Sequence, residues 1–182
     1  ENTRHLIHAP SHPMGWTAGK WREWYPDLLE SRGTLLAQVD SDNSDKKYNW
    51  QSGWWHQHQR LCQRMSQQKK RKAICVSGDL HLLGSGKIQQ SGDLDLSNNP
   101  VTSILSGPAG VGDLGWLSRA RGVTAEHPKS VKVDNLLKPV ERNGYTLLQV
   151  NQESIQVQQF QCPTGLPGAE MLTVEEVAQF TI

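Results

Sequence analysis

The chain has 182 residues, enough for one domain with a hydrophobic core or for part of a larger domain. Its formal net charge of +1 and its sequence pI of about 8.0 argue against a nucleic-acid-binding protein. No apolar stretch approaches the roughly 20 residues that a membrane-spanning helix requires.

The first predicted strand covers Arg4 to Ile7, and the two prolines within residues 8–13 exclude a helix there. Residues 16–29 are aromatic and loop-like, with one short helix, and residues 40–47 predict an exposed loop. The first third of the chain holds six of the seven tryptophans: Trp16, Trp21, Trp24, Trp50, Trp54 and Trp55. Such a cluster either lines a groove or contact surface or packs in the core beneath a long loop.

The strongest helix signal covers Trp50 to Gln68. One stripe of this helix carries Trp54, His58, Leu61 and Met65, and Gln and Arg fill the other side. The basic run at residues 69–72 suits the solvated C-terminus of a helix. An apolar strand, Ala73 to Ser77, follows directly, so the order is helix and then strand.

Further along, Gly84 to Lys87 and the Ser-Gly-Asp at 91–93 predict loops and a hairpin. The Gly-Ser-Gly-Lys lacks the spacing and the following Ser or Thr of a phosphate-binding loop. Val101 to Ser106 predicts a strand that ends in a glycine-rich segment, residues 107–121. Tyr145–Val150 and Ile155–Phe160 alternate apolar and polar residues and predict an antiparallel hairpin. The tail carries a short amphipathic stretch, residues 174–180.

Three cysteines, Cys62, Cys75 and Cys162, are widely spaced and form no Cys-x-x-Cys pair. We therefore expect free thiols, with Cys75 in the core. The chain begins at Glu1, just before histidine-rich sequence, without an initiator methionine or a signal peptide. We expect it to be a fragment of a longer protein.

An acid and an imidazole, Asp79 and His81, follow the buried strand just after Gly78, which lets the chain turn. In an extended segment residues i and i+2 point to the same side, so both side chains should meet at the carboxyl end of the strand. There they can hold a metal or a substrate group. The alternative is a capping Asp79 and a satisfied core His81.

A second possible ligand, His8, stands just past the first short strand. His5 and His12 flank it, and any one of the three can supply a ligand from a loop. Two ligand sets at the ends of different strands are what a binuclear metal site requires. Carboxylate and imidazole ligands suit Mn, Fe or Zn.

The stretch Val76 to His81 resembles the PhoD-like branch of the calcineurin-like metallophosphoesterases. The helix Trp50–Met65 before it, Pro100–Pro108 after it and the closing hairpin Asn143–Phe160 resemble the same family. The likeness covers most of the chain but only the C-terminal half of such a domain. It implies that residues 1–182 are the C-terminal portion of one α/β domain, a β-sandwich flanked by helices.

The last metal motif of that superfamily is Gly-His-x-His, and Gly78 to His81 occupies it with Asp79 in place of the first His, as in the PhoD-like branch. The resemblance implies that His81 serves the first metal ion and Asp79 the second, which makes them the catalytic residues. His8 matches an earlier motif, a lone His before x-Pro, and would be a third metal ligand. The two ions would be Mn, Fe or Zn, with Ca as a further choice.

The function implied is the hydrolysis of phosphate esters at this binuclear centre, with Trp54, Arg60 and the loop Gly107–Gly115 as candidates to line the substrate cleft. The family's opening motifs are absent from the chain and are expected in the remaining N-terminal part of the parent protein. We therefore expect little or no turnover by the isolated chain. The alternative is a non-catalytic binding or assembly module with a Trp-rich contact surface.

Overall fold

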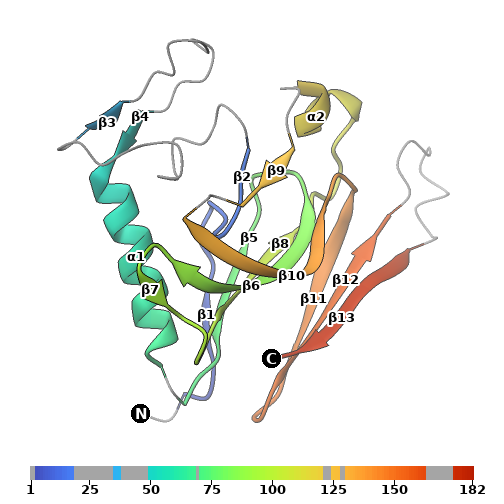
Figure 1. Cartoon of the computed structure of the whole chain (residues 1–182). Coiled ribbons are helices and arrows are strands. Elements are labelled where there is room, and N and C mark those ends of the chain that lie inside the picture. The colour runs from blue at the N-terminus through green and yellow to red at the C-terminus, as the bar shows by residue number, and fades with distance from the viewer. Residues whose placement is uncertain are drawn as a thin grey trace.

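The computed structural model describes residues 3–18, 35–37, 49–68, 70–120, 124–127, 130–162 and 174–182 of the chain. Two β-sheets dominate these residues, one mixed and one antiparallel, and helices are few (Figure 1). Most of the residues predicted to form the loops at 16–29 and 40–47 lie outside the described part of the chain.

The mixed sheet has six strands: β1 (Leu6–His8), β5 (Ala73–Ser77), β6 (Leu83–Ser91), β7 (Leu94–Asp95), β8 (Val101–Ser106) and β10 (Val131–Val140). Their order is β1-β5-β8-β6-β10, with β7 paired to β6. The antiparallel sheet has the order β11 (Gly144–Val150), β12 (Ile155–Gln161) and β13 (Glu175–Thr181). Two short pairs join β2 (Thr17–Ala18) to β9 (Ala125–Glu126) and β3 (Leu35–Ala37) to β4 (Asn49–Gln51).

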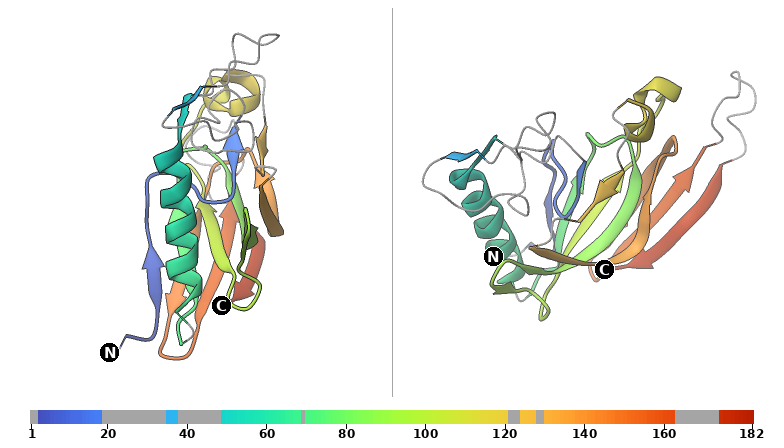
Figure 2. Two further views of the ribbon diagram at one scale, coloured as in Figure 1. Left: turned by 60° about the vertical axis from the view of Figure 1, so that its left-hand side comes forward. Right: turned by 45° about the horizontal axis from the view of Figure 1, so that its top comes forward.

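One helix, α1 (Ser52–Ser66), confirms the strongest helix prediction, and α2 (Leu117–Ala120) is a single turn. β5 supplies residues to two cores because its side chains alternate between the faces of the sheet. Ala73 and Cys75 pack with Cys62 and Met65 of α1. Ile74 instead packs with residues of β12, namely Ile155 and Val157. The mixed sheet therefore lies between α1 and the antiparallel sheet, as both views show (Figures 1 and 2).

Three parallel strands, β1, β5 and β8, end together at one edge of the mixed sheet. β6 is antiparallel to β8 and begins at this edge, where Leu83 pairs with Ser106. β10 ends there, because Val140 also pairs with Leu83. We call this end of the mixed sheet, where β1, β5 and β8 terminate, the carboxyl edge. The basic run precedes β5 and so lies at the opposite edge.

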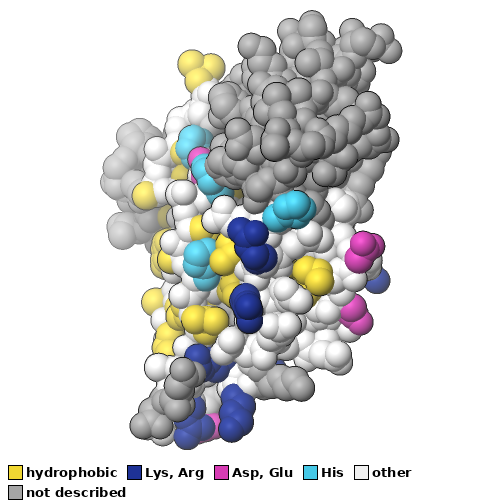
Figure 3. All heavy atoms as spheres, turned by 90° about the vertical axis from the view of Figure 1, so that its left-hand side faces the viewer, with side chains coloured by type: hydrophobic (Ala, Val, Ile, Leu, Met, Phe, Trp, Pro, Cys, Tyr) yellow, Lys and Arg dark blue, Asp and Glu magenta, His cyan; other side chains and the backbone are white. Residues whose placement is uncertain are grey.

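The face that carries α1 shows scattered Lys and Arg side chains over its lower part, interspersed with polar ones (Figure 3). Lys70 and Lys72 are exposed, and the Arg71 Nε donates a hydrogen bond to the backbone oxygen of Thr3 at 3.0 Å. Helix α1 itself ends at Ser66, so residues 70–72 follow it in a turn where Lys70 and Lys72 are solvated. No described helix has the length and apolar character needed to span a membrane.

Several predicted elements agree with the structure: β5, β8 and the hairpin of β11 and β12. All three cysteines are free, and Cys75 is buried in the core. The expected loop at Gly84–Lys87 is wrong, because these residues lie in β6, whose buried glycines let neighbouring chains approach closely. A Cβ on Gly86 would lie 2.7 Å from Val133 Cγ1.

Candidate metal centre

A tight loop, residues 78–82, connects β5 to β6 at the carboxyl edge and carries Asp79 and His81. Both residues adopt a left-handed backbone, with φ of 69° and 54°. The Leu80 N–H donates a hydrogen bond to the Gly78 oxygen at 2.9 Å, which closes the turn. The predicted position at the strand end is confirmed, but the extended geometry assumed for this pair is wrong. Turn geometry, and not strand alternation, sets the directions of the two side chains.

The imidazole of His81 is held by the loop that follows β8. Its Nδ1 lies 2.8 Å from the backbone oxygen of Gly115, and the ring is exposed. A carbonyl oxygen can only accept, so Nδ1 carries the proton in this hydrogen bond. In the neutral ring Nε2 then keeps its lone pair. Metal-ligating histidines are oriented in this way, with the other ring nitrogen donating to a backbone carbonyl.

Asp79 has a histidine partner from the loop after β1. Its Oδ2 lies 3.6 Å from His12 Nδ1, and both side chains are about two-fifths exposed. The sequence did not decide which of the three histidines near β1 lies close to Asp79. In the structure His12 does. His5 is at the other end of β1, where its Nε2 donates to the Asn151 oxygen at 2.6 Å.

His8 is the last residue of β1, at the carboxyl edge, and its backbone pairs with Cys75 one strand away. Its side chain is half-buried. Within the described ranges, no three His, Cys, Asp or Glu side chains lie close enough to hold a metal ion. Asp79, His81 and His12 nevertheless lie at the same edge of the mixed sheet. A role for His8 as a metal ligand stays a prediction.

The loop that holds His81 is itself fixed to the antiparallel sheet. The side chain of Asn143 accepts a hydrogen bond from the Val111 N–H at 2.7 Å and donates one to the Val111 oxygen at 3.1 Å. Beyond Gly115, the carboxylate of Glu141 accepts bonds from both the N–H and the hydroxyl of Ser118. Gly115 of the loop Gly107–Gly115 therefore lies against His81, and a role for this loop in lining a substrate cleft stays a prediction.

The other two substrate-cleft candidates lie on α1. Arg60 is exposed in the middle of the helix, and the side chain of Trp54 lies outside the described part of the structure. Neither residue is shown in contact with Asp79 or His81, and both assignments stay predictions. Trp16 and Trp116 are core residues, 1% and 6% exposed.

A second histidine environment occurs between α1 and β6. Burial lowers the pKa of His58 to about 4, and its Nδ1 lies 3.2 Å from Ser91 Oγ. Burial also raises the pKa of Cys62 and of Cys75 to about 12. All three groups stay neutral at physiological pH. Cys62 and Cys75 belong to the core, and His58 lies half-buried beside it.

Sequence reasoning missed the two backbone-directed contacts that shape the centre, Gly115 to His81 and Asn143 to Val111. Every residue has a backbone carbonyl, so the sequence does not indicate which carbonyl oxygen accepts the hydrogen bond from His81. The Asn143–Val111 contact joins residues that are far apart in the sequence, so no local pattern around Asn143 indicated it.

Comparison with known proteins gives no relative. No protein-family model, no curated protein and no solved structure matches this chain.

Proposed function

We propose that this chain supplies the last ligand motifs of a binuclear metal centre that hydrolyses phosphate esters. On this proposal it is the C-terminal portion of a PhoD-like metallophosphoesterase domain of the β-sandwich type. The observation that carries the proposal is His81, an exposed imidazole whose Nδ1–H is engaged by Gly115 and whose Nε2 is thereby available. Asp79 supplies a carboxylate two residues away, on the same strained turn.

The donor chemistry fits the metals in question. Imidazole nitrogen and carboxylate oxygen are ligands for Mn, Fe and Zn, and Asp79 and His81 would hold the ions. Bound ions would make a water molecule more acidic and offset the charge of the phosphate. Two ligands are too few for two ions, so the proposal includes further ligands from His8 and from the parent protein's opening motifs.

Two further residues support the proposed ligands Asp79 and His81. Gly115 fixes the His81 ring, and His12 Nδ1 steadies the Asp79 carboxylate. In the reaction, a water oxygen forms a bond to phosphorus, the bond from phosphorus to the ester oxygen breaks, and the leaving alcohol takes up a proton. The products are an alcohol and a phosphate with one ester bond fewer.

The non-catalytic alternative gains no specific support. Its contact surface would consist of the tryptophans in the first third of the chain, and the one of them whose side chain is described, Trp16, is buried. A buried indole contributes to the core and cannot form a contact surface.

The test is metal content by mass spectrometry on the parent protein, together with turnover of p-nitrophenyl phosphate and bis-p-nitrophenyl phosphate. We expect about two transition-metal ions per chain in the wild type. His81→Ala should lose metal and at least a hundredfold in turnover. His5→Ala is the matched control, because His5 lies at the far end of β1 and bonds to Asn151.

Metal-free parent protein that shows no turnover after addition of Mn, Fe or Zn would overturn the proposal. Equal losses in His81→Ala and His5→Ala would also contradict it, since they would indicate a general effect on folding.

A further inference from the structure

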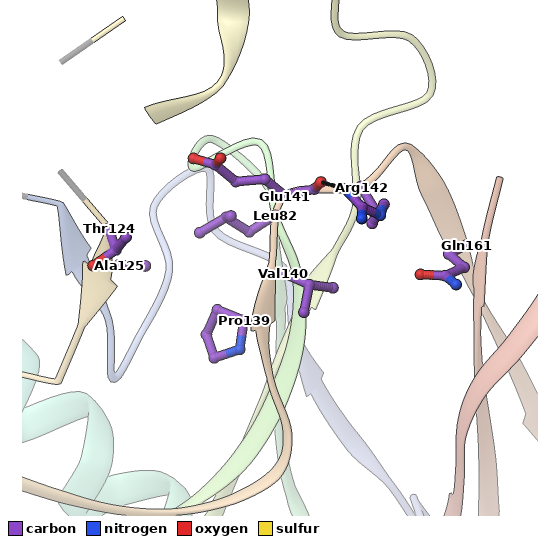
Figure 4. A pocket seen from close by; sticks show the side chains of 8 residues that line it. All are labelled: Leu82, Thr124, Ala125, Pro139, Val140, Glu141, Arg142 and Gln161. Carbon is purple, nitrogen blue, oxygen red and sulfur yellow. Dashed lines mark hydrogen bonds between the residues drawn. The ribbon is translucent and has the colours of Figure 1, made fainter. Parts of the chain in front are cut away.

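An open cavity of about 450 Å³ lies at the carboxyl edge of the mixed sheet (Figure 4). Its volume is within the range of about 300–1,000 Å³ typical of small-molecule sites. It is lined by Leu82, Thr124, Ala125, Pro139, Val140, Glu141, Arg142 and Gln161. The metal-centre proposal assigns no role to the polar residues of this set.

The cavity belongs to the carboxyl edge. Leu82 directly follows His81, and Val140 ends β10 opposite Leu83, the first residue of β6. Gln161 ends β12, where it pairs with Gly144. The cavity therefore opens at the same end of the mixed sheet as the turn that carries His81.

Half of the residues that line the cavity are apolar. The other half includes two charged residues, Glu141 and Arg142, which differ in their hydrogen-bond partners. The carboxylate of Glu141 is engaged by two donors of Ser118. The guanidinium of Arg142 donates from one Nη to the backbone oxygen of Glu141 at 3.0 Å. The two charged ends point away from each other across the end of β10 (Figure 4). Arg142 is exposed, and among the described residues no carboxylate lies within ion-pairing distance of it.

An arginine in this state is suited to an anion. The guanidinium carries five N–H donors in a planar fork that matches a carboxylate or a phosphate, and the backbone contact uses one of them. A neighbouring carboxylate would normally accept hydrogen bonds from these donors. The carboxylate of Glu141 instead accepts its hydrogen bonds from Ser118. The apolar residues Leu82, Pro139 and Val140 offer a surface for the body of the same ligand.

We propose that this cavity receives the leaving group of the phosphate ester and that Arg142 selects esters whose leaving group carries its own anionic group. The anion is a carboxylate or a second phosphate on a short apolar body. This inference rests on the proposed function, and Arg142 acts in it as a specificity-determining residue.

A binding experiment on the parent protein tests the cavity without any turnover. The probes are 4-hydroxybenzoate, 4-hydroxyphenylphosphonate and the uncharged 4-hydroxybenzamide, titrated by calorimetry. We expect at least one anionic probe to bind tenfold or more tightly than the amide, and the stronger of the two identifies the preferred anion. Arg142→Gln should remove this difference. Lys138→Gln, which removes a nearby exposed positive charge outside the cavity, should keep it.

A turnover experiment on the parent protein then connects the cavity to catalysis. The quantity measured is the ratio of kcat/KM for 4-carboxyphenyl phosphate to that for p-nitrophenyl phosphate. Arg142→Gln should lower this ratio about tenfold, and Lys138→Gln should leave it unchanged.

The outcomes separate the two proposals. Equal binding of all three probes, or an unchanged ratio in Arg142→Gln, would overturn the inference and leave the phosphatase proposal intact. Arg142-dependent binding in a parent protein that hydrolyses no ester would support an anion-binding cavity and overturn its role in ester hydrolysis.

Discussion

The backbone of Asp79 has a conformation that costs free energy in any residue with a Cβ atom. Its φ of 69° lies in the left-handed region, where glycine is the residue without strain. Such strain in a non-glycine residue costs of order 1–3 kcal/mol and concentrates at functional sites, with Asp at the low end. His81, two residues later, shares the same feature with φ of 54°. On the proposed function, this strain is the cost of placing a carboxylate and an imidazole together at the turn.

The corresponding prediction concerns Asp79→Gly. Relief of the strain should offset the extra freedom that glycine gains in the unfolded chain, so the free energy of unfolding should stay within about 0.5 kcal/mol or rise. Metal binding should nevertheless fall. Urea denaturation measures the first quantity, with Asp93→Gly as the control, because Asp93 is exposed and has no positive φ. A loss of stability at position 79 as large as at position 93 would contradict the argument.

At the scale of elements, the loop after β8 depends on a clamp from the other sheet. Asn143 satisfies both backbone groups of Val111, and the same loop supplies the Gly115 carbonyl that orients His81. Removal of the amide in Asn143→Ala should lower the free energy of unfolding by about 1–3 kcal/mol, because two polar groups lose their partner. The Val111 amide should exchange its hydrogen faster, and metal affinity should fall several-fold.

A matched variant distinguishes this local effect from a general loss of stability. Asn99→Ala removes an amide that donates to backbone oxygens at the opposite edge, including Ser66 and Arg71. It should destabilise the fold while leaving Val111 exchange and metal affinity unchanged. Unaltered Val111 exchange in Asn143→Ala would show that the clamp does not hold the loop.

The elements that could be predicted from sequence are those with a regular apolar period. α1 shows helical spacing and β5 is a short apolar run, whereas β11 and β12 alternate. Strand β6 was not predicted, because Gly84 and Gly86 are residues typical of a loop. In the structure these glycines lack the Cβ atoms that would collide with Pro139 and Val133, so the neighbouring strand can pack closely. β10 was not predicted for a different reason: it is an edge strand in which only Val131 is fully buried, and its register is irregular. Such a strand needs no apolar alternation.

At the scale of the whole molecule, the candidate centre joins segments that lie far apart in the sequence. His12, the turn at Asp79 and His81, the loop ending at Gly115 and Asn143 meet because parallel strands bring their ends to one edge. The ligand-type residues at strand ends could be predicted from sequence. The approach of His12 to Asp79 could not, because it depends on the path of a proline-containing loop. The Gly115 contact also required the fold, since any residue provides a carbonyl.

His58 couples the stability of the molecule to pH through the contact between α1 and β6. Burial lowers its pKa from 6.5 to about 4, so below pH 6.5 the unfolded chain binds a proton that the folded chain does not. The free energy of unfolding therefore decreases as pH falls from about 6.5 toward 4. The adjacent Cys62 stays neutral throughout this range, because burial raises its pKa to about 12.

We expect this one group to account for about 2 kcal/mol of the stability lost between pH 7 and pH 4.5. His58→Gln should reduce the loss by that amount, as measured by urea denaturation at both pH values. His56→Gln is the control, because His56 is exposed two residues away on the same helix. If wild type and His58→Gln lose the same free energy over this range, the buried imidazole does not set the acid limit of the fold. A smaller loss in His58→Gln alone would show that the contact between α1 and β6, remote from the carboxyl edge, controls acid stability independently of any metal.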